Sequence, residues 1–163
     1  MITLGIDPGL ATVGFGVVGS DVRGHRAIEY GTVLTKPGLL LEERLELIYD
    51  GVYQLAVRHS PDAAAVEELF FSRNVTTGIT VAHARGVILL ALQRARIPIY
   101  EYTPLQIKQA VVGYGRADKR QMMYMTRVML GMDEIPRPDD AADALAVAIT
   151  HANSCRAYDA GVR

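Results

Sequence analysis

The first third of the chain shows two-residue alternation of apolar and polar or small side chains, which is typical of β-strands. Residues 2–7 (ITLGID) alternate in this way, and TVGFGVV at 12–18 continues the pattern after a Pro-Gly turn, so the two segments are predicted to form a hairpin. AIEYGTVLT at 27–35 follows a polar turn and reads as a third strand. We therefore expect an antiparallel meander of three strands.

The period changes after residue 40, where a helix is predicted. Apolar residues recur at steps of three and four, as on one face of an amphipathic helix, at Leu41, Leu45, Ile48, Val52 and Leu55. DAAAVEEL at 62–69 has the short apolar character of a buried parallel strand, and a long helix is expected at 75–94. IPIYEY at 97–102 reads as a fifth strand. The remainder is predicted to be helical, with breaks at 113–115 and in the proline-rich MDEIPRPDD.

Three strands followed by two strand–helix repeats predict an α/β fold. The expected sheet is mixed and five-stranded, with strand order 3-2-1-4-5 and helices on its faces, which is the ribonuclease H-like arrangement. A chain of 163 residues that is 50% hydrophobic can fill one core, so we expect a single domain at residues 1–151. Residues 152–163 are expected to form a flexible tail.

Composition narrows the possible partners. Seventeen Lys and Arg against eighteen Asp and Glu give a formal charge of −1, so a polyanion would have to be bound by a local basic patch. We expect no membrane contact, because the apolar runs are too short to cross a bilayer. The chain opens directly into a strand and its only cysteine is Cys155, which together favour a cytoplasmic protein without disulfides.

Acidic residues far apart in the sequence are predicted to converge. Asp7 ends the first strand, and either Glu67 or Glu68 ends the fourth, which is its neighbour in the expected sheet. Asp140 and Asp143 stand at i and i+3 and therefore share one face of the last helix.

Such a carboxylate cluster suggests metal-dependent chemistry. Several buried carboxylates repel one another unless divalent cations lie between them, and all-oxygen ligands suit Mg²⁺ or Mn²⁺. Two such ions about 3.5 to 4 Å apart can activate a water and stabilise the leaving oxygen in phosphodiester hydrolysis. The pattern therefore favours a nuclease.

Simpler roles exist for some of these residues. Asp139, at the start of the last helix, fits the role of a cap and dipole partner, and the Glu67-Glu68 pair could be the solvated end of a strand. Asp7 is harder to explain in this way, because it shares a strand with Gly5 and is expected to lie opposite Gly14 and Gly16. We interpret these glycines as leaving space around a carboxylate that holds metal and phosphate.

Six ordered segments resemble one known family from residue 4 to about residue 151. They are GIDPG, the T-x-G-x-G at 12–16, AVEELFFSRN, the HARGV at 83–87, QIKQAVVGYGRADK and DDAADALAVAITH. Their order and spacing are similar to those of the RuvC family of bacterial crossover-junction endonucleases, the Holliday junction resolvases.

The resemblance implies a ribonuclease H-like homodimer that makes paired, metal-dependent cuts in four-way DNA junctions. It implies two Mg²⁺ ions per subunit, with Mn²⁺ possible, held by the catalytic carboxylates of Asp7, Glu67, Asp140 and Asp143, and it selects Glu67 over Glu68. It also implies RuvA and RuvB, the branch-migration proteins, as partners.

The resemblance further implies residues that contact DNA. Lys108 and Lys119 correspond to lysines near the scissile phosphate that act in catalysis and DNA binding, although a lysine on a helix is most often simply solvated. Other expected DNA contacts are the aromatic wedge Phe70 and the residues Arg73, Tyr114, Arg116 and Arg120. From the sequence itself, Arg116, Lys119 and Arg120 form a basic segment beside two glycines, with a tyrosine able to stack on bases.

A stripe of small residues on the helix at 75–94 is a candidate contact between subunits. Gly78, Ala82 and Gly86 lie along it and would let another helix approach closely, although they could equally serve packing on the chain's own sheet. The resemblance assigns this segment to the dimer contact, and two symmetric cuts require a two-fold dimer.

Two other functions compete with the nuclease. The Asp-x-Gly hairpin is also found in actin-like and sugar-kinase proteins that bind ATP phosphates, but these need two such halves around the nucleotide. A catalytically silent junction-binding module is the second alternative, although the complete set of four acids argues against it.

Overall fold

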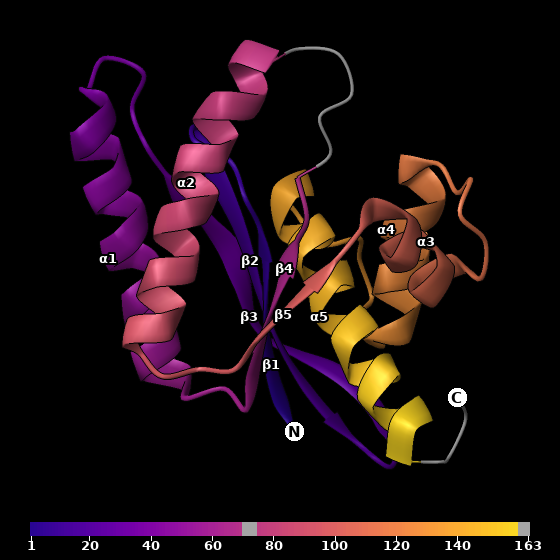
Figure 1. Cartoon of the computed structure of the whole chain (residues 1–163). Coiled ribbons are helices and arrows are strands. Elements are labelled where there is room, and N and C mark those ends of the chain that lie inside the picture. Colours follow the sequence, from indigo (N-terminus) through magenta and orange to yellow (C-terminus); the bar gives the residue numbers. More distant parts are fainter. Residues whose placement is uncertain (70–74, 160–163) are drawn as a thin grey trace.

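The computed structural model describes residues 1–69 and 75–159, except for the side chains of 75–77 and 156–159. These residues form a central sheet between two layers of helices (Figure 1). The strands of the sheet are β1 (Ile2–Asp7), β2 (Thr12–Asp21), β3 (Gly24–Leu34), β4 (Ala63–Glu67) and β5 (Ile99–Tyr102). Their spatial order is β3-β2-β1-β4-β5, which confirms the predicted ribonuclease H-like order.

The sheet is mixed, as the sequence predicts. β1 pairs antiparallel with β2, and β2 with β3, whereas β1 and β4, and β4 and β5, run parallel. In this register Asp7 lies opposite Gly14, and Ile6 lies opposite Val66. The carboxyl ends of β1 and β4 therefore meet at the same edge of the sheet, at the centre of the strand order.

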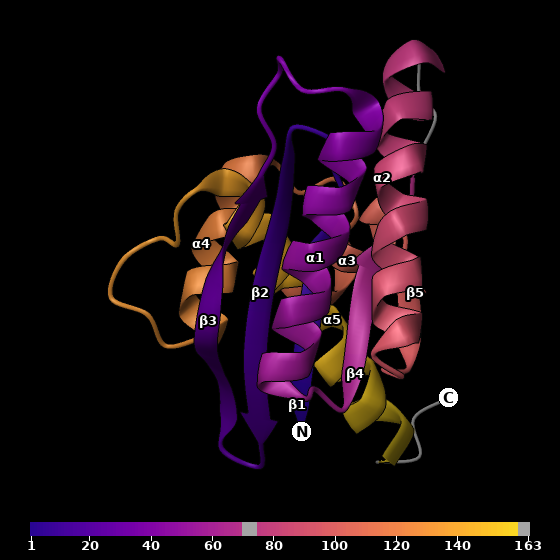
Figure 2. The same cartoon turned by 90° about the vertical axis from the view of Figure 1, so that its left-hand side faces the viewer.

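Two helices cover one face of the sheet and three cover the other. α1 (Leu41–His59) and α2 (Val75–Arg94) pack side by side on the first face, as Figure 2 shows from that side. Their inward residues, including Ile48, Val52, Ile88 and Leu92, are fully buried against the sheet. On the other face α5 (Asp139–Asp159) lies along β1 and β2, with α3 (Pro104–Val112) and α4 (Lys119–Met129) packed on α5. Within the described ranges, no helix is both long enough and apolar enough to span a membrane.

The glycines of β1 and β2 have a different role from the one predicted. A Cβ on Gly5 would overlap the main-chain oxygen of Ala144, and one on Gly14 would overlap the main-chain oxygen of Asp140. The space is thus filled by the backbone of α5, and not by a metal or phosphate, so our interpretation was wrong. The absent side chains let the helix approach the sheet closely.

Helix α5 continues past the expected boundary at residue 151. It runs without a break to Asp159, and Ala152 within it is fully buried. The stretch expected to be a tail therefore begins inside a helix that packs on the sheet.

Candidate active site

Asp7 and Glu67 are placed together by the two central strands. Asp7 is the last residue of β1, and Glu67 is the last residue of the parallel neighbour β4. The apolar residues that precede them, Ile6 and Val66, are paired in the register and fully buried. The strand ends are thereby fixed, and the two carboxyl groups form a hydrogen bond with each other.

The first turn of α5 brings two more acids to the same place. Asp140 and Asp143 both raise the pKa of Asp7 through their charge, which shows that all four predicted acids lie within electrostatic reach of one another. The close approach of α5 at Gly14 is what brings Asp140 over the sheet. The structure thus brings together the four acids that the sequence singled out.

Burial and mutual repulsion make this cluster unfavourable for negative charge. Burial, followed by the charge of Glu67 and of the two helix acids, raises the pKa of Asp7 from 3.8 to about 8. Burial and the charge of Asp143 also raise the pKa of Glu67, against the hydrogen bond from Asp7 and the positive charge of Lys108. The cluster therefore favours a proton on Asp7 over a full set of negative charges.

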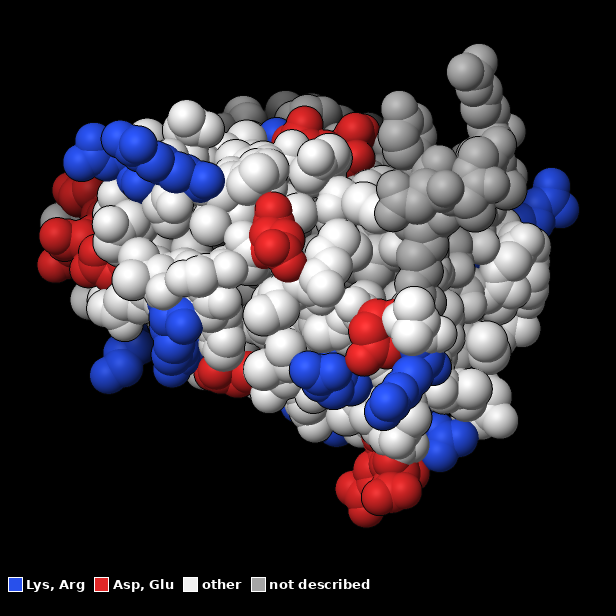
Figure 3. Space-filling model, turned by 90° about the horizontal axis from the view of Figure 1, so that it is seen from below, with Lys and Arg blue, Asp and Glu red and all other residues white. Residues whose placement is uncertain are grey.

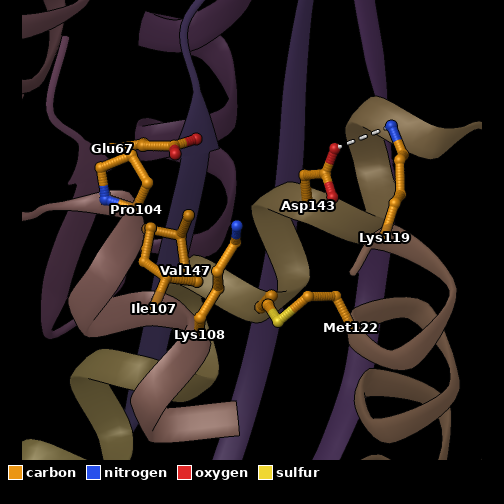
Figure 4. Close-up of a pocket in the computed structure, with 9 residues that line it drawn as sticks. Glu67, Pro104, Ile107, Lys108, Lys119, Met122, Asp143 and Val147 are labelled. Carbon is orange, nitrogen blue, oxygen red and sulfur yellow. Dashed lines mark hydrogen bonds and ion pairs between the residues drawn. The ribbon is translucent and has the colours of Figure 1, made fainter. Parts of the chain in front are cut away.

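Two lysines face the acids from the neighbouring helices. Figure 4 shows Lys108 extending from α3 between Glu67 and Asp143, with Lys119 of α4 opposite Asp143. The Lys119 ammonium lies 3.3 Å from a carboxylate oxygen of Asp143. Burial raises the pKa of Asp143, and the ammonium of Lys119 opposes that shift.

Helix caps fix where each lysine stands. Thr103 caps α3 by accepting a hydrogen bond from the Gln106 backbone amide, with Pro104 in the first turn. Asp118 caps α4 in the same way through the Gln121 amide, at 2.9 Å, so Lys119 is the first residue of that helix. Local sequence therefore determines both helix starts.

The lysines and two of the acids line a pocket of about 220 Å³. Its charged groups are Glu67, Asp143, Lys108 and Lys119, and its apolar floor is formed by Pro104, Ile107, Met122, Ala146 and Val147. A pocket in which ammonium groups lie next to carboxylates can bind a phosphate beside a cation.

The residues around Asp7 fit divalent cations in their chemistry. Four carboxylates offer only oxygen ligands, and burial together with the charges of the other three acids raises the pKa of Asp7, although Lys108 and Lys119 lie beside Glu67 and Asp143. In the structure the ammonium group of Lys119, a monovalent cation, lies beside Asp143. Among the described residues, no three His, Cys, Asp or Glu side chains are arranged to hold an ion as they stand, so the carboxylates would have to draw together around one.

Some of the predicted DNA contacts lie within the residues that the structure describes, and others lie outside them. Tyr114, Arg116 and Arg120 are exposed on the segment that joins α3 to α4 and at the start of α4, next to Lys119. Gly113 ends α3 with a φ of 92°, a conformation that favours glycine. Phe70 and Arg73 lie outside the described residues.

Sequence reasoning missed the partners of Asp139. It was interpreted as a cap and dipole partner, and it is indeed the first residue of α5. Its carboxylate also forms ion pairs with Lys119, at 3.4 Å, and with Arg137. No local pattern could have shown the contact with Lys119, because the two residues are brought together only by the packing of α4 on α5.

A ribonuclease H-like sheet that carries clustered carboxylates at its centre, faced by two lysines, is the arrangement of a metal-dependent nuclease. Comparison with known proteins then identifies the family. The family model described as "Crossover junction endodeoxyribonuclease RuvC" matches residues 3–151. The chain belongs to the RuvC family.

Individual relatives agree with this assignment. A crossover junction endodeoxyribonuclease RuvC of Chloroflexus aurantiacus is 58% identical over 153 residues, which cover 93% of both chains. A solved structure of Thermus thermophilus RuvC superimposes with a TM-score of 0.90 at 41% identity, covering 96% of each chain. A structure of T. thermophilus RuvC in complex with a Holliday junction substrate gives 0.88 at 38% identity, again over 96% of each chain. These relatives favour neither the actin-like reading nor a silent binding module.

Proposed function

We propose that the protein is a structure-selective endonuclease that resolves four-way DNA junctions by paired symmetric nicks, in recombination and DNA repair. The observation that carries the proposal is the convergence of four acids, in which burial and the charges of Glu67, Asp143 and Asp140 raise the pKa of Asp7 to about 8. Family membership supports the substrate, since a relative has been solved with a Holliday junction.

The four carboxylates would hold two Mg²⁺ ions per subunit, or Mn²⁺ in their place. Bound there, the cations would supply an activated water and stabilise the leaving 3′ oxygen of the phosphodiester. Asp7 and Glu67 would bind the ions from the ends of β1 and β4, and Asp140 and Asp143 would bind them from the first turn of α5. A cation and a proton would compete for Asp7, because its raised pKa favours the protonated carboxyl group when no cation is bound.

Lys108 and Lys119 bind the scissile phosphate in this proposal. Both line the pocket beside the acids, and their ammonium groups can stabilise the charge that develops on the phosphate in the transition state. Tyr114, Arg116 and Arg120 would extend the DNA contact from the α3–α4 segment, where they are exposed. Phe70 and Arg73 keep the same proposed roles on the basis of the family resemblance.

Bound cations would also change the charge that the protein presents to DNA. The end of the molecule opposite the acids, seen in Figure 3, carries basic and acidic side chains interspersed among other residues. Two dications would add four positive charges to the formal −1 and give +3. We therefore expect junction affinity to rise when Ca²⁺ is added, and equal affinity with and without the cation would contradict this charge balance.

The decisive test is cleavage of a synthetic four-way junction, labelled on each strand in turn, by the wild type and by Asp7→Asn. The wild type should make paired symmetric nicks with Mg²⁺ and none with EDTA, and Asp7→Asn should bind the junction without cutting it. ATP hydrolysis without nicking would instead support the actin-like alternative. Binding without cutting by the wild type would support the silent module.

A homodimer through α2 is the second part of the proposal. Ile79, His83, Gly86 and Leu90 are exposed and fall on one helix stripe, and Ile79 and Leu90 keep about half of their surface accessible (50% and 53%). A Cβ on Gly86 would meet nothing within 4 Å, so the stripe has room for a second helix. Such an exposed apolar stripe is typical of an interaction surface.

Light scattering of matched variants tests the dimer. Leu90→Asp should shift the wild-type dimer to a monomer at micromolar concentration. Val57→Asp is the control, because Val57 is equally exposed (55%) on the neighbouring helix α1 but lies off the stripe. A monomeric wild type, or a dimer that survives Leu90→Asp, would contradict the proposed interface.

The family resemblance also supports RuvA and RuvB as partners and, since the substrate is chromosomal, a cytoplasmic location. Co-purification of the three proteins on an immobilised junction would test the association. Direct contact would be contradicted if the junction retained the same amounts of RuvA and RuvB with and without this protein, and if RuvA and RuvB did not increase the amount of this protein retained.

A further inference from the structure

Lys119 stands between two carboxylates of α5. Its ammonium lies 3.3 Å from Oδ2 of Asp143 and 3.4 Å from Oδ2 of Asp139. Asp139 and Asp143 are at i and i+4, on one face of the first turn of the helix. The two acids therefore share one lysine, although only Asp143 belongs to the carboxylate cluster.

Asp139 lies at the edge of that cluster, where its charge helps to raise the pKa of Asp143. The charges that raise the pKa of Asp7 come from Glu67, Asp143 and Asp140, and Asp139 is not among them. The pocket is lined by Asp143 and Lys119, but Asp139 does not line it. Its second carboxylate oxygen pairs with Arg137, which does not line the pocket either. Asp139 is thus placed to hold Lys119 without contacting the substrate.

The two contacts of Lys119 differ in what a divalent cation would do to them. If Asp143 binds a cation, as the proposed function requires, its oxygens turn to that ion and its contact with Lys119 is weakened. The contact with Asp139 is unaffected, because Asp139 has no part in the cation site. Without Asp139, a lysine that is 53% exposed would keep only the weakened contact with Asp143 to hold it at the pocket before DNA binds.

We propose that Asp139 is a positioning residue, which retains Lys119 at the pocket when a divalent cation takes over Asp143. The inference rests on the proposed function, since it assumes a cation at Asp143 and a phosphate near Lys119. It gives the chain a second anchor for that lysine, supplied by the residue that immediately precedes the D-A-A-D pattern.

A double-mutant cycle separates this role from a general effect on the site. Single-turnover cleavage of a four-way junction with Mg²⁺ is measured for the wild type, Asp139→Asn, Lys119→Gln and the double variant. Asp139→Asn should slow cleavage about three- to tenfold with junction affinity within about twofold. In the Lys119→Gln background it should add no further slowing. An equal slowing in both backgrounds would overturn the proposal.

Arg137→Gln is the matched control, because it removes the other partner of Asp139 and leaves Lys119 paired. It should cleave within about twofold of the wild-type rate. If instead it slows cleavage as much as Asp139→Asn does, Asp139 acts by holding the segment before α5, and the positioning role fails.

A measurement of Mn²⁺ binding without DNA shows whether Asp139 positions Lys119 or is itself a cation ligand. Mn²⁺ is titrated into each full-length variant while the electron paramagnetic resonance signal of the free ion is recorded. Asp140→Asn should weaken Mn²⁺ binding at least tenfold, and Asp139→Asn less than about threefold. Equal losses of Mn²⁺ affinity in the two variants would make Asp139 a cation ligand and would overturn its role as a positioning residue. Failure of the wild type to nick junctions at all would count against the proposed function instead, and would leave the Mn²⁺ comparison readable.

Discussion

The two faces of the sheet are packed in different ways. On the α1–α2 face, large aliphatic side chains such as Ile48, Ile88 and Leu92 fill the space between helix and strand. On the α5 face, glycines of β1 and β2 lie against the helix backbone, as at Gly5 and Gly14. Side chains thus separate the layers on one face, and the main chains themselves meet on the other.

This difference in packing indicates what fixes the positions of the acidic side chains in the site. Packed aliphatic side chains can adjust to a changed neighbour by shifting rotamers, whereas a contact between backbones has no flexible part that can give. Because α5 carries Asp140 and Asp143, its rigid contact with β1 and β2 also sets their distance from Asp7. We therefore expect substitutions on the two faces to affect stability and cleavage differently.

The largest effect is expected for Gly14→Ala on the α5 face. The added methyl overlaps the backbone of Asp140, so the start of α5 must move. We expect a loss of about 3 kcal/mol in unfolding free energy and at least a hundredfold slower cleavage by the folded fraction, because misplacement by about 1 Å has that effect. Urea unfolding and single-turnover cleavage would measure both.

Gly38→Ala provides the control for that substitution. Gly38 lies in a turn, and a Cβ there would meet nothing within 4 Å. Stability within about 0.5 kcal/mol of the wild type and an unchanged cleavage rate are expected. Normal cleavage by folded Gly14→Ala would show that the α5 contact does not position the acids.

Ile88→Ala on the opposite face should separate stability from cleavage. The side chain is fully buried between α2 and the sheet, so its truncation is expected to lower the unfolding free energy by about 2 to 5 kcal/mol. The surviving folded protein should cleave within about twofold of the wild-type rate at saturating protein, because neither β1 nor α5 moves. A hundredfold loss here would remove the distinction between the two faces.

Asp7→Asn should stabilise the cation-free protein. The folded-state pKa of Asp7, about 8, exceeds its ordinary value of 3.8, so between these values the folded protein binds more protons than the unfolded chain. Stability therefore falls as the pH rises through this window. Each pKa unit corresponds to about 1.4 kcal/mol, so removing the charge should raise the unfolding free energy at pH 8 by several kcal/mol, and the melting temperature by about 2 to 4 °C for each kcal/mol.

The pH dependence of melting gives the sharper form of this prediction. Thermal melts in EDTA from pH 5 to 8 should show a smaller loss of stability for Asp7→Asn than for the wild type. Asp50→Asn, at an exposed position on α1, is the control and should follow the wild type. Parallel curves for Asp7→Asn and the wild type would mean that Asp7 is not held in a cluster of like charge.

Much of the fold follows from short-range pattern in the sequence. Two-residue alternation and helical periodicity are local properties, and with the rules for strand connection they were enough for the sheet order and for the helix at 75–94. The convergence of Asp7 with Glu67 was predictable for the same reason, because strand order alone brings the ends of β1 and β4 together.

What could not be predicted depends on contacts between layers. Spacing in the chain does not show that the glycines of β2 face a helix and not a ligand, nor that Lys119 lies between Asp139 and Asp143. The choice of Glu67 over Glu68 came from the family resemblance, and the hydrogen bond to Asp7 agrees with it. Strand alternation could not make that choice, because both residues stand at the strand end.

The most direct test of a shared cation site is anomalous diffraction from crystals of the full-length protein soaked in Mn²⁺. The account predicts Mn²⁺ peaks enclosed by the side chains of Asp7, Glu67, Asp140 and Asp143, with Lys119 still beside Asp139. Peaks bound at other acidic residues, or a soaked crystal with these four carboxylates still apart and free of Mn²⁺, would contradict it.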